Sequence, residues 1–273
     1  MRVNEPREIP LIGGRANVGS VVRIGDEVAR PAHPQSPYVA DFLDYLRRQG
    51  CELGPVPIGF DDQGRQRLGF IPGQAPTPPY PTWAFEHDLL VDVAERQREL
   101  QVAAQGYVPP NGATWAVSGG DYFPEGAGFE HASGLFCHND LCLSNVIVDP
   151  EQRRVTGFVD FDYVAPVDRR FDIAVLARHW VPFGDANAAE PIDLDRVRRF
   201  QTICDVHDLD HADRAFVVDL GVKFLERART NVRALADGGN IGFQQMIANG
   251  YEATNRETVA WIVDHARELA RTP

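Results

Sequence analysis

Lysine is almost absent from this chain of 273 residues, in which Lys223 is the only one. Lysine and arginine together number 27 against 39 acidic residues, and the formal net charge is -12. A charge of this sign disfavours nucleic acids and anionic membranes as main partners. No apolar run approaches the roughly 20 residues that a membrane-spanning helix needs, and the first residues lack the apolar core of a signal peptide. We therefore expect a cytoplasmic protein.

Cysteine is also scarce, and its spacing excludes two kinds of scaffold. The four cysteines are scattered along the chain without a Cys-x-x-Cys pair. This spacing argues against a disulfide framework or a zinc site and favours free thiols in a reducing compartment. A hydrophobic content of 44% over this length predicts one large domain or two lobes that share a cleft.

The distribution of patterns along the chain predicts a β-rich first part and a mainly helical remainder. Prolines cluster over residues 72–82, where we place a hinge, so the predicted lobes are residues 1–73 and 74–273. In the first lobe, alternating and β-branched residues predict strands at 17–25, 26–30, 56–60 and 66–71, with a helix at 38–49. Beyond the hinge, the predicted helices are 83–105, 171–180, 193–207, 211–236 and 242–271, and short strands are expected at 135–137, 145–149 and 155–161.

One segment between those short strands carries the residues for a specific chemistry. His138, Asp140 and Asn145 have the spacing His-x-Asp-x-x-x-x-Asn, and Asp160 and Asp162 end the next apolar strand. Phosphoryl transfer needs a carboxylate that orients a hydroxyl and accepts its proton, and hard oxygen ligands that hold magnesium against the phosphates. We predict that Asp140 is the catalytic base and that Asn145 and Asp160 bind magnesium. His138 is expected to tether the loop, and Asp162 to be a further metal contact or a supporting acid.

The segment from Leu135 to Ala174 resembles the aminoglycoside phosphotransferase and choline kinase family. The features that carry the resemblance are the H-x-D-x-x-x-x-N loop, a strand that ends in D-F-D, and a downstream D-x-A that begins at Asp172. The resemblance extends more weakly over about residues 11–180. It implies an α+β, two-lobed protein-kinase-like fold with a small β-rich N-lobe and a larger, mainly helical C-lobe. It also implies that Asp172 braces the catalytic loop.

In such a fold the first lobe would hold the nucleotide, ATP or GTP. Gly14, Asn17 and Val18 lie in a glycine-rich segment whose backbone amides are expected to approach phosphates. The hinge strand, with Phe70 and Ile71, is expected to border the nucleotide base.

Kinase-like folds place a phosphate-binding lysine on the third strand, and this lobe has none. Arg30 ends the corresponding strand, and its guanidinium is the predicted replacement because it can grip phosphate oxygens in a fork. Asp41 and Asp44 on the following helix are the predicted ion-pair partners of Arg30.

The acceptor is predicted only as a molecule with a hydroxyl group. The family's substrate site lies between the catalytic loop and the C-terminal helices, where acids occur at Asp193, Asp195, Glu226 and Glu252. These acids suit a cationic aminoglycoside, but a metabolite hydroxyl or a serine or threonine on a biosynthetic peptide is equally open.

Two other classes of protein compete with the kinase. A nucleotide-binding pseudokinase without turnover is favoured by the missing lysine and disfavoured by the intact catalytic segment. A metal-dependent hydrolase is disfavoured because His207 and His211 are expected on opposite sides of a helix break. The sequence leaves the oligomeric state open.

Overall fold

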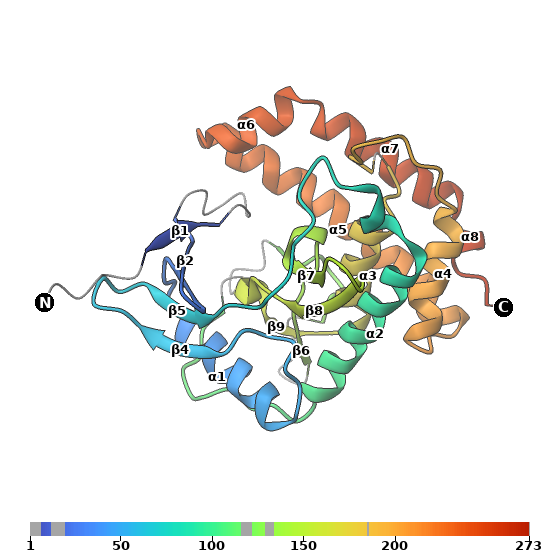
Figure 1. The fold of residues 1–273 in the computed structure, drawn as a ribbon. Coiled ribbons are helices and arrows are strands. Elements are labelled where there is room, and N and C mark those ends of the chain that lie inside the picture. The colour runs from blue at the N-terminus through green and yellow to red at the C-terminus, as the bar shows by residue number, and fades with distance from the viewer. Residues whose placement is uncertain (1–6, 12–19, 116–121, 129–133, 185, 273) are drawn as a thin grey trace, which may run out of the picture.

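A computed structural model describes residues 7–11, 20–115, 122–128, 134–184 and 186–272. The N-terminal strands form an antiparallel sheet at one side of the molecule, and helices make up most of the other side (Figure 1). The strand order is β1-β2-β3-β5-β4. The strands are β1 (Glu8–Pro10), β2 (Val22–Ile24), β3 (Glu27–Arg30), β4 (Pro57–Phe60) and β5 (Gln66–Gly69).

Local chemistry explains the turns of this sheet. Gly25, at φ 63°, makes the tight turn that joins β2 to β3, a conformation that glycine adopts without steric cost. The turn between β4 and β5 is closed by Asp61, whose side chain accepts hydrogen bonds from the backbone N–H groups of Gln63 and Arg65. In the same sheet β3 pairs with β5, which places Arg30 at the end of β3, opposite Gln66.

The helix α1 (Ser36–Arg48) follows β3 and packs against the catalytic segment. Its apolar residues recur at helical spacing, and Val39, Phe42, Leu43 and Leu46 are buried. The helix has proline in its first turn and is followed by Gly50 at φ 83°, which are favoured residues for these positions.

Two short pairs of antiparallel strands hold the catalytic segment between the sheet and the helices. One pairs β6 (Leu135–Cys137) with β9 (Ala165–Val167), and the other pairs β7 (Val146–Asp149) with β8 (Arg154–Phe158). The backbones of Gln74 and Val148 exchange two hydrogen bonds, which tie the segment after β5 to the β7–β8 hairpin.

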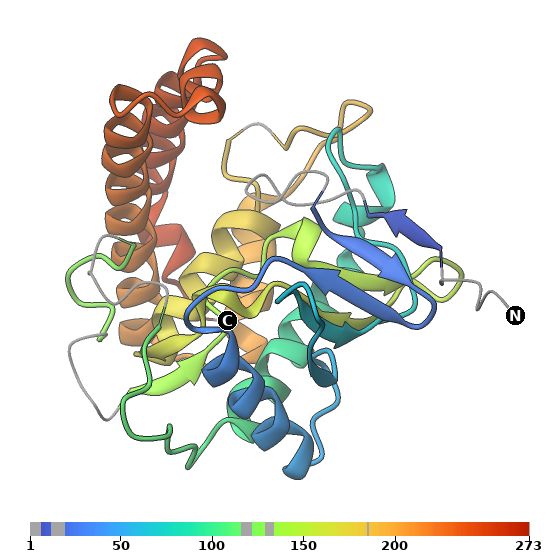
Figure 2. The ribbon, with the colours of Figure 1, turned by 90° about the vertical axis from the view of Figure 1, so that its left-hand side faces the viewer.

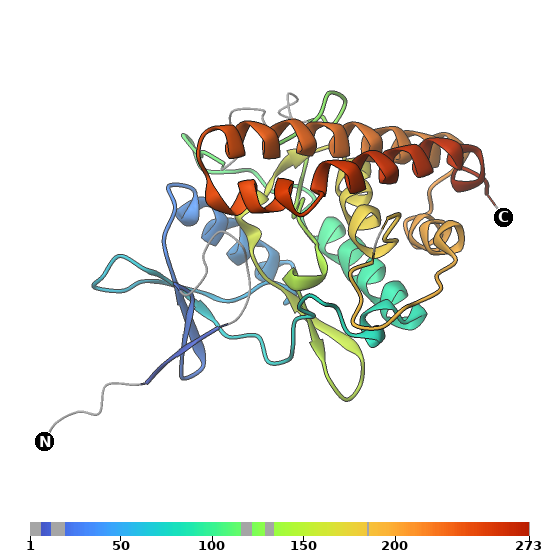
Figure 3. The ribbon, with the colours of Figure 1, turned by 90° about the horizontal axis from the view of Figure 1, so that it is seen from above.

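The helices form the other part of the molecule. Helices α5, α6 and α7 stand together as a layer at one side, as Figure 2 shows, and the same layer runs across the view from above in Figure 3. The helices beyond the hinge are α2 (His87–Ala103), α3 (Arg169–Trp180), α4 (Arg196–Val206), α5 (His211–Asp237), α6 (Ile241–Ala248), α7 (Tyr251–Asp264) and α8 (Ala266–Leu269). The short 3-10 helices are η1 (Thr82–Phe85), η2 (Leu143–Asn145) and η3 (Phe161–Tyr163). Within the described ranges, no helix is long and apolar enough to cross a membrane.

The structure corrects two predicted helices. The helix expected at 83–105 is divided, because Glu86 has an extended backbone at ψ 143° that ends η1 before α2 begins. The helix expected at 242–271 is three helices, since Gly250 at φ 85° separates α6 from α7 and His265 separates α7 from α8.

Candidate active site

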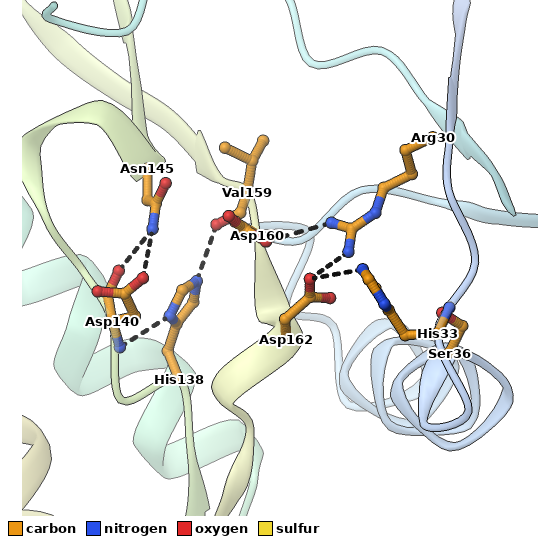
Figure 4. A network of polar contacts seen from close by, with 9 residues as sticks. All are labelled: Arg30, His33, Ser36, His138, Asp140, Asn145, Val159, Asp160 and Asp162. Atoms are coloured by element: carbon orange, nitrogen blue, oxygen red, sulfur yellow. Dashed lines mark hydrogen bonds and ion pairs between the residues drawn. The ribbon is translucent and has the colours of Figure 1, made fainter. Parts of the chain in front are cut away.

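His138 is a buried anchor of the loop that follows β6. Its ring contributes Nε2 to a 3.0 Å contact with the backbone oxygen of Val159, and the N–H of Asp140 donates to Nδ1 at 3.3 Å. Burial lowers the pKa of His138 to about 4, so the ring is neutral at pH 7. A neutral ring with a proton on Nε2 satisfies both contacts. His138 thus ties the catalytic loop to the strand that leads to Asp160, as Figure 4 shows.

A second buried anchor holds the same loop from the opposite side. Asp172, near the start of α3, accepts the backbone N–H of Asn139 at 2.8 Å with Oδ1. Its Oδ2 accepts side-chain amide hydrogens of Gln97 at 2.9 Å and Gln101 at 2.8 Å, both from α2. Asn139 has φ 62°, a conformation that is uncommon outside glycine and that these hydrogen bonds support.

Asp140 and Asn145 contact each other directly. The Asn145 Nδ2 donates to the Asp140 side chain at 3.1 Å and to its backbone oxygen at 2.8 Å (Figure 4). This orientation leaves Asn145 Oδ1 as the atom that can face a cation. Burial, with a further contribution from the charge of Asp160, raises the pKa of Asp140 to about 7. A carboxylate with that pKa can accept a proton near neutral pH.

The two acids of the D-F-D motif meet Arg30 from β3. The Arg30 NH1 lies 3.2 Å from Asp160 Oδ1, and its NH2 donates to Asp162 Oδ2 (Figure 4). His33 Nε2 lies 3.8 Å from the same oxygen of Asp162. Burial and the neighbouring Asp162 charge raise the pKa of Asp160, while Arg30 opposes that shift. Arg30 therefore joins the N-terminal sheet to the catalytic segment, 130 residues further along the chain.

The ion-pair partner predicted for Arg30 was wrong. Neither Asp41 nor Asp44 pairs with Arg30 in the described residues, and Asp41 instead accepts the Tyr107 hydroxyl at 2.9 Å. The reason is that β3 ends beside the D-F-D acids, which pair with Arg30, whereas Asp41 is held by Tyr107. The partner acid comes from a long-range contact that the spacing of α1 could not reveal.

The structure describes only some of the other residues that are predicted to bind the nucleotide. Gly14, Asn17 and Val18 lie outside the described residues. Phe70 stacks under the guanidinium of Arg23, which is 3.7 Å from its ring centroid, and its N–H donates to the backbone oxygen of Asp26. The Phe70 N–H is thus already used, and the side chain of Ile71 packs over Gly157.

Sequence reasoning missed a group of aromatic residues beside the catalytic loop. The Tyr122 hydroxyl donates to the backbone oxygen of Asn139 at 2.8 Å, and its ring stacks on Tyr163 with centroids 4.3 Å apart. Phe224 of α5 makes an edge contact with the Tyr122 ring at 5.2 Å. These three rings, called the aromatic cluster below, come from distant segments, so no local spacing in the sequence marks them.

The residues near Asp160 suit magnesium by their chemistry. Carboxylate oxygens and an amide oxygen are hard ligands, and magnesium in kinase sites is held by one or two carboxylates together with phosphates and water. The attraction of Arg30 to both acids shows that a positive charge is favoured at this point. In kinase sites phosphate and water complete the magnesium ligand set. Across the described part of the chain, no group of three His, Cys, Asp or Glu side chains is placed to hold a metal ion.

Comparison with known proteins agrees with this site. The model of the family described as "Phosphotransferase enzyme family" matches residues 127–197, which contain the catalytic loop, the D-F-D motif and Asp172. An aminoglycoside 3'-phosphotransferase of Streptomyces fradiae is 30% identical over 174 residues, which is 51% of this chain and 62% of that enzyme. Residues 127–197, which carry the candidate site, are thus similar in sequence to this phosphotransferase family.

Other known proteins are similar to this chain over more of its length. The trifolitoxin immunity protein of Rhizobium leguminosarum bv. trifolii is 28% identical over 226 residues, 80% of each chain. A choline/ethanolamine kinase family protein from Mesorhizobium loti shares the fold with a TM-score of 0.64 and 16% identity, over 97% of this chain and 94% of that one. Aminoglycoside 2'-phosphotransferase-IIIa, solved as a GDP complex, has a TM-score of 0.58 and 14% identity over 95% and 94%. The predicted protein-kinase-like fold is confirmed.

Proposed function

We propose that this chain is a magnesium-dependent kinase that transfers the γ-phosphate of ATP or GTP to a hydroxyl group of a small molecule. The observation that carries the proposal is one continuous network of polar contacts. Asn145 donates to the Asp140 side chain, and the Asp140 N–H donates to His138. His138 in turn contacts the backbone oxygen of the residue before Asp160, which pairs with Arg30. Phosphoryl transfer needs a proton acceptor, oxygen ligands for a metal and a phosphate-binding cation, and this network contains all three kinds of group.

Asp140 is the group that handles the proton. Its contact with Asn145 fixes one carboxylate oxygen, and the raised pKa suits the carboxylate to accept the acceptor's hydroxyl proton as the oxygen attacks phosphorus. The bond from the γ-phosphorus to the bridging oxygen then breaks, and a nucleoside diphosphate leaves. Asp172 and His138 act only by keeping this loop in place.

Asn145 and Asp160, with Asp162 beside them, would hold magnesium. When bound, the ion neutralises phosphate charge. Arg30 already contacts both aspartates, and its fork can exchange a carboxylate oxygen for a phosphate oxygen.

The two lobes take different parts of this work. Residues 1–73 would hold the nucleotide, with the glycine-rich segment at the phosphates and the segment around Phe70 and Ile71 near the base. Residues 74–273 would carry the catalytic loop and the acceptor site. The solved phosphotransferase with GDP supports a nucleotide donor in this fold.

A labelled-phosphate assay tests the proposal. The chain is incubated with γ-labelled ATP or GTP and magnesium, with a panel of hydroxyl compounds, and label in the acceptor is measured. Asp140→Asn should lower turnover about 10² to 10⁴-fold, the usual contribution of a general acid–base group, while nucleotide affinity stays unchanged. Wild-type turnover in this variant would remove Asp140 from the chemistry, and nucleotide binding without any transfer would favour a pseudokinase.

A further inference from the structure

The aromatic cluster lies next to an arginine that the catalytic network does not use. Arg178 is on α3, and its guanidinium carbon is 5.7 Å from the ring centroid of Phe224. Phe224 contacts Tyr122, whose hydroxyl is bonded to Asn139, the residue before Asp140. A positive charge thus lies beside the aromatic cluster.

Arg178 has no carboxylate partner. Among the described residues no acid lies within ion-pair distance of it, and its NH1 contacts only the ring of His179, at 3.2 and 3.3 Å. Its Nε is buried and has no hydrogen-bond partner there. Arg30 and Arg214, which are more deeply buried than Arg178, each pair with an aspartate. A buried donor without a partner costs free energy, so Arg178 is a group for which a ligand would be the missing acceptor.

The acids that could have served a cationic acceptor are otherwise occupied or exposed. Asp195 caps α4 by accepting the N–H of Arg198, and Glu252 is paired with Arg233. Asp193 and Glu226 are exposed to solvent. Apart from the carboxylates of the catalytic network itself, a polycation would therefore meet Arg178 without a buried acid to offset the charge, which disfavours it.

We propose that Arg178 binds an anionic group of the acceptor, a carboxylate or a phosphate, and that the partly exposed rings of Tyr122 and Tyr163 in the aromatic cluster contact the apolar part of the same molecule. This inference rests on the proposed kinase activity and names the acceptor class: a hydroxyl compound that carries a negative charge. Arginine matches such anions because its planar fork donates two parallel hydrogen bonds. The charge of Arg178 also reaches Asp140, where it opposes the rise in the pKa of that carboxyl.

Matched acceptors that differ only in charge test the inference. The set is para-(hydroxymethyl)benzoate, para-(hydroxymethyl)phenyl phosphate, the matching neutral amide and the matching benzylamine, with choline and streptomycin as further cations. Initial rates of label transfer from γ-labelled ATP give kcat/KM for each compound. The wild type should prefer one of the two anions, and the preferred anion distinguishes a carboxylate from a phosphate group. Arg178→Gln should lower kcat/KM for that anion about tenfold to a hundredfold, mainly through KM, and leave the amide unchanged.

Two further variants separate binding from a loss of structure. Arg178→Lys keeps the charge without the fork and should restore part of the loss. Arg153→Gln removes a guanidinium that stacks on Trp83 at 4.5 Å, away from the network, and should change no preference. Equal or greater rates for the amide or the cations, or an unchanged preference in Arg178→Gln, would overturn the inference while leaving a working kinase. Failure of the wild type to bind nucleotide or to transfer phosphate to any compound would overturn the proposed function, and this inference with it.

Discussion

Replacing Asp172 by asparagine should slow catalysis without weakening nucleotide binding. The carboxylate accepts with both oxygens, from the Asn139 N–H on one side and from Gln97 and Gln101 on the other. Asparagine supplies one acceptor oxygen and one NH₂ group, so at least one buried N–H would face another donor. Either the backbone of the catalytic loop or its support on α2 must then move.

The size of the effect follows from the number of donors that lose an acceptor. Each buried, unsatisfied donor costs about 1–3 kcal/mol, and total stabilities are about 5–15 kcal/mol. Asp172→Asn should lower the free energy of unfolding by about 1–3 kcal/mol. Asp172→Ala leaves both the Asn139 amide and Gln101 unsatisfied and should cost about twice as much. A loop shift of this kind should lower kcat about tenfold to a hundredfold, because it displaces Asp140 from the attacking hydroxyl.

A matched control distinguishes bracing of the loop from general destabilisation. Asp92 is also a buried aspartate that accepts a backbone N–H, that of Val155, but it lies on α2 away from the catalytic loop. Urea unfolding, kcat and nucleotide affinity should be measured for the wild type, Asp172→Asn and Asp92→Asn. Both variants should lose stability, and only Asp172→Asn should lose kcat. If the two variants keep equal kcat, the reasoning that Asp172 positions Asp140 is refuted.

Three further predictions concern charged groups. Arg30→Ala should weaken ATP and ADP binding about tenfold to a hundredfold and leave adenosine binding unchanged, with Arg30→Lys intermediate; an equal ratio of ATP to adenosine affinity in all three proteins would refute the phosphate contact. Asp160→Ala should weaken magnesium–ATP binding in calorimetric titrations, and an unchanged magnesium dependence would exclude Asp160 from the metal site. Burial lowers the pKa of His207 to about 3, so its neutral form adds stability that is present above the unfolded pKa of about 6.5 and is lost as pH falls toward the folded pKa. Between pH 7.5 and 5.5 the free energy of unfolding, measured with urea, should fall by about 1.4 kcal/mol more in the wild type than in His207→Gln. Equal losses would contradict the lowered pKa of His207.

The catalytic segment could be predicted from the sequence because its parts are close together along the chain. Asp140, Asn145 and Asp160 lie within about twenty residues, and the intervening hairpin returns the chain to the same point. Local spacing therefore carries most of the geometry. The turn at Gly25 and the helix α1 were predicted for the same reason, since each depends on neighbouring residues.

Features that depend on distant contacts were not predictable in this way. The partner of Arg30 comes from 130 residues away, and the aromatic cluster combines residues of three separate segments. The break at Glu86 has no proline or glycine of its own, so the continuous helical pattern of 83–105 concealed it. Such features are set by how the two parts of the molecule pack, which a single sequence does not encode locally.

The pairing of Arg30 with the D-F-D acids has a consequence for how the site would work. In protein kinases the strand lysine is held by a glutamate on the helix that follows it, at a distance from the metal ligands. Here the same carboxylates, Asp160 and Asp162, hold the strand cation and are the expected metal ligands. Two carboxylates, those of Asp160 and Asp162, contact one guanidinium, so the ionised pair retains net negative charge and attracts a further cation. If Asp160 and Asp162 held magnesium, the ion would share their oxygens with Arg30, whose fork would then be available to phosphate oxygens. Metal and nucleotide would in that case bind better together than either binds alone.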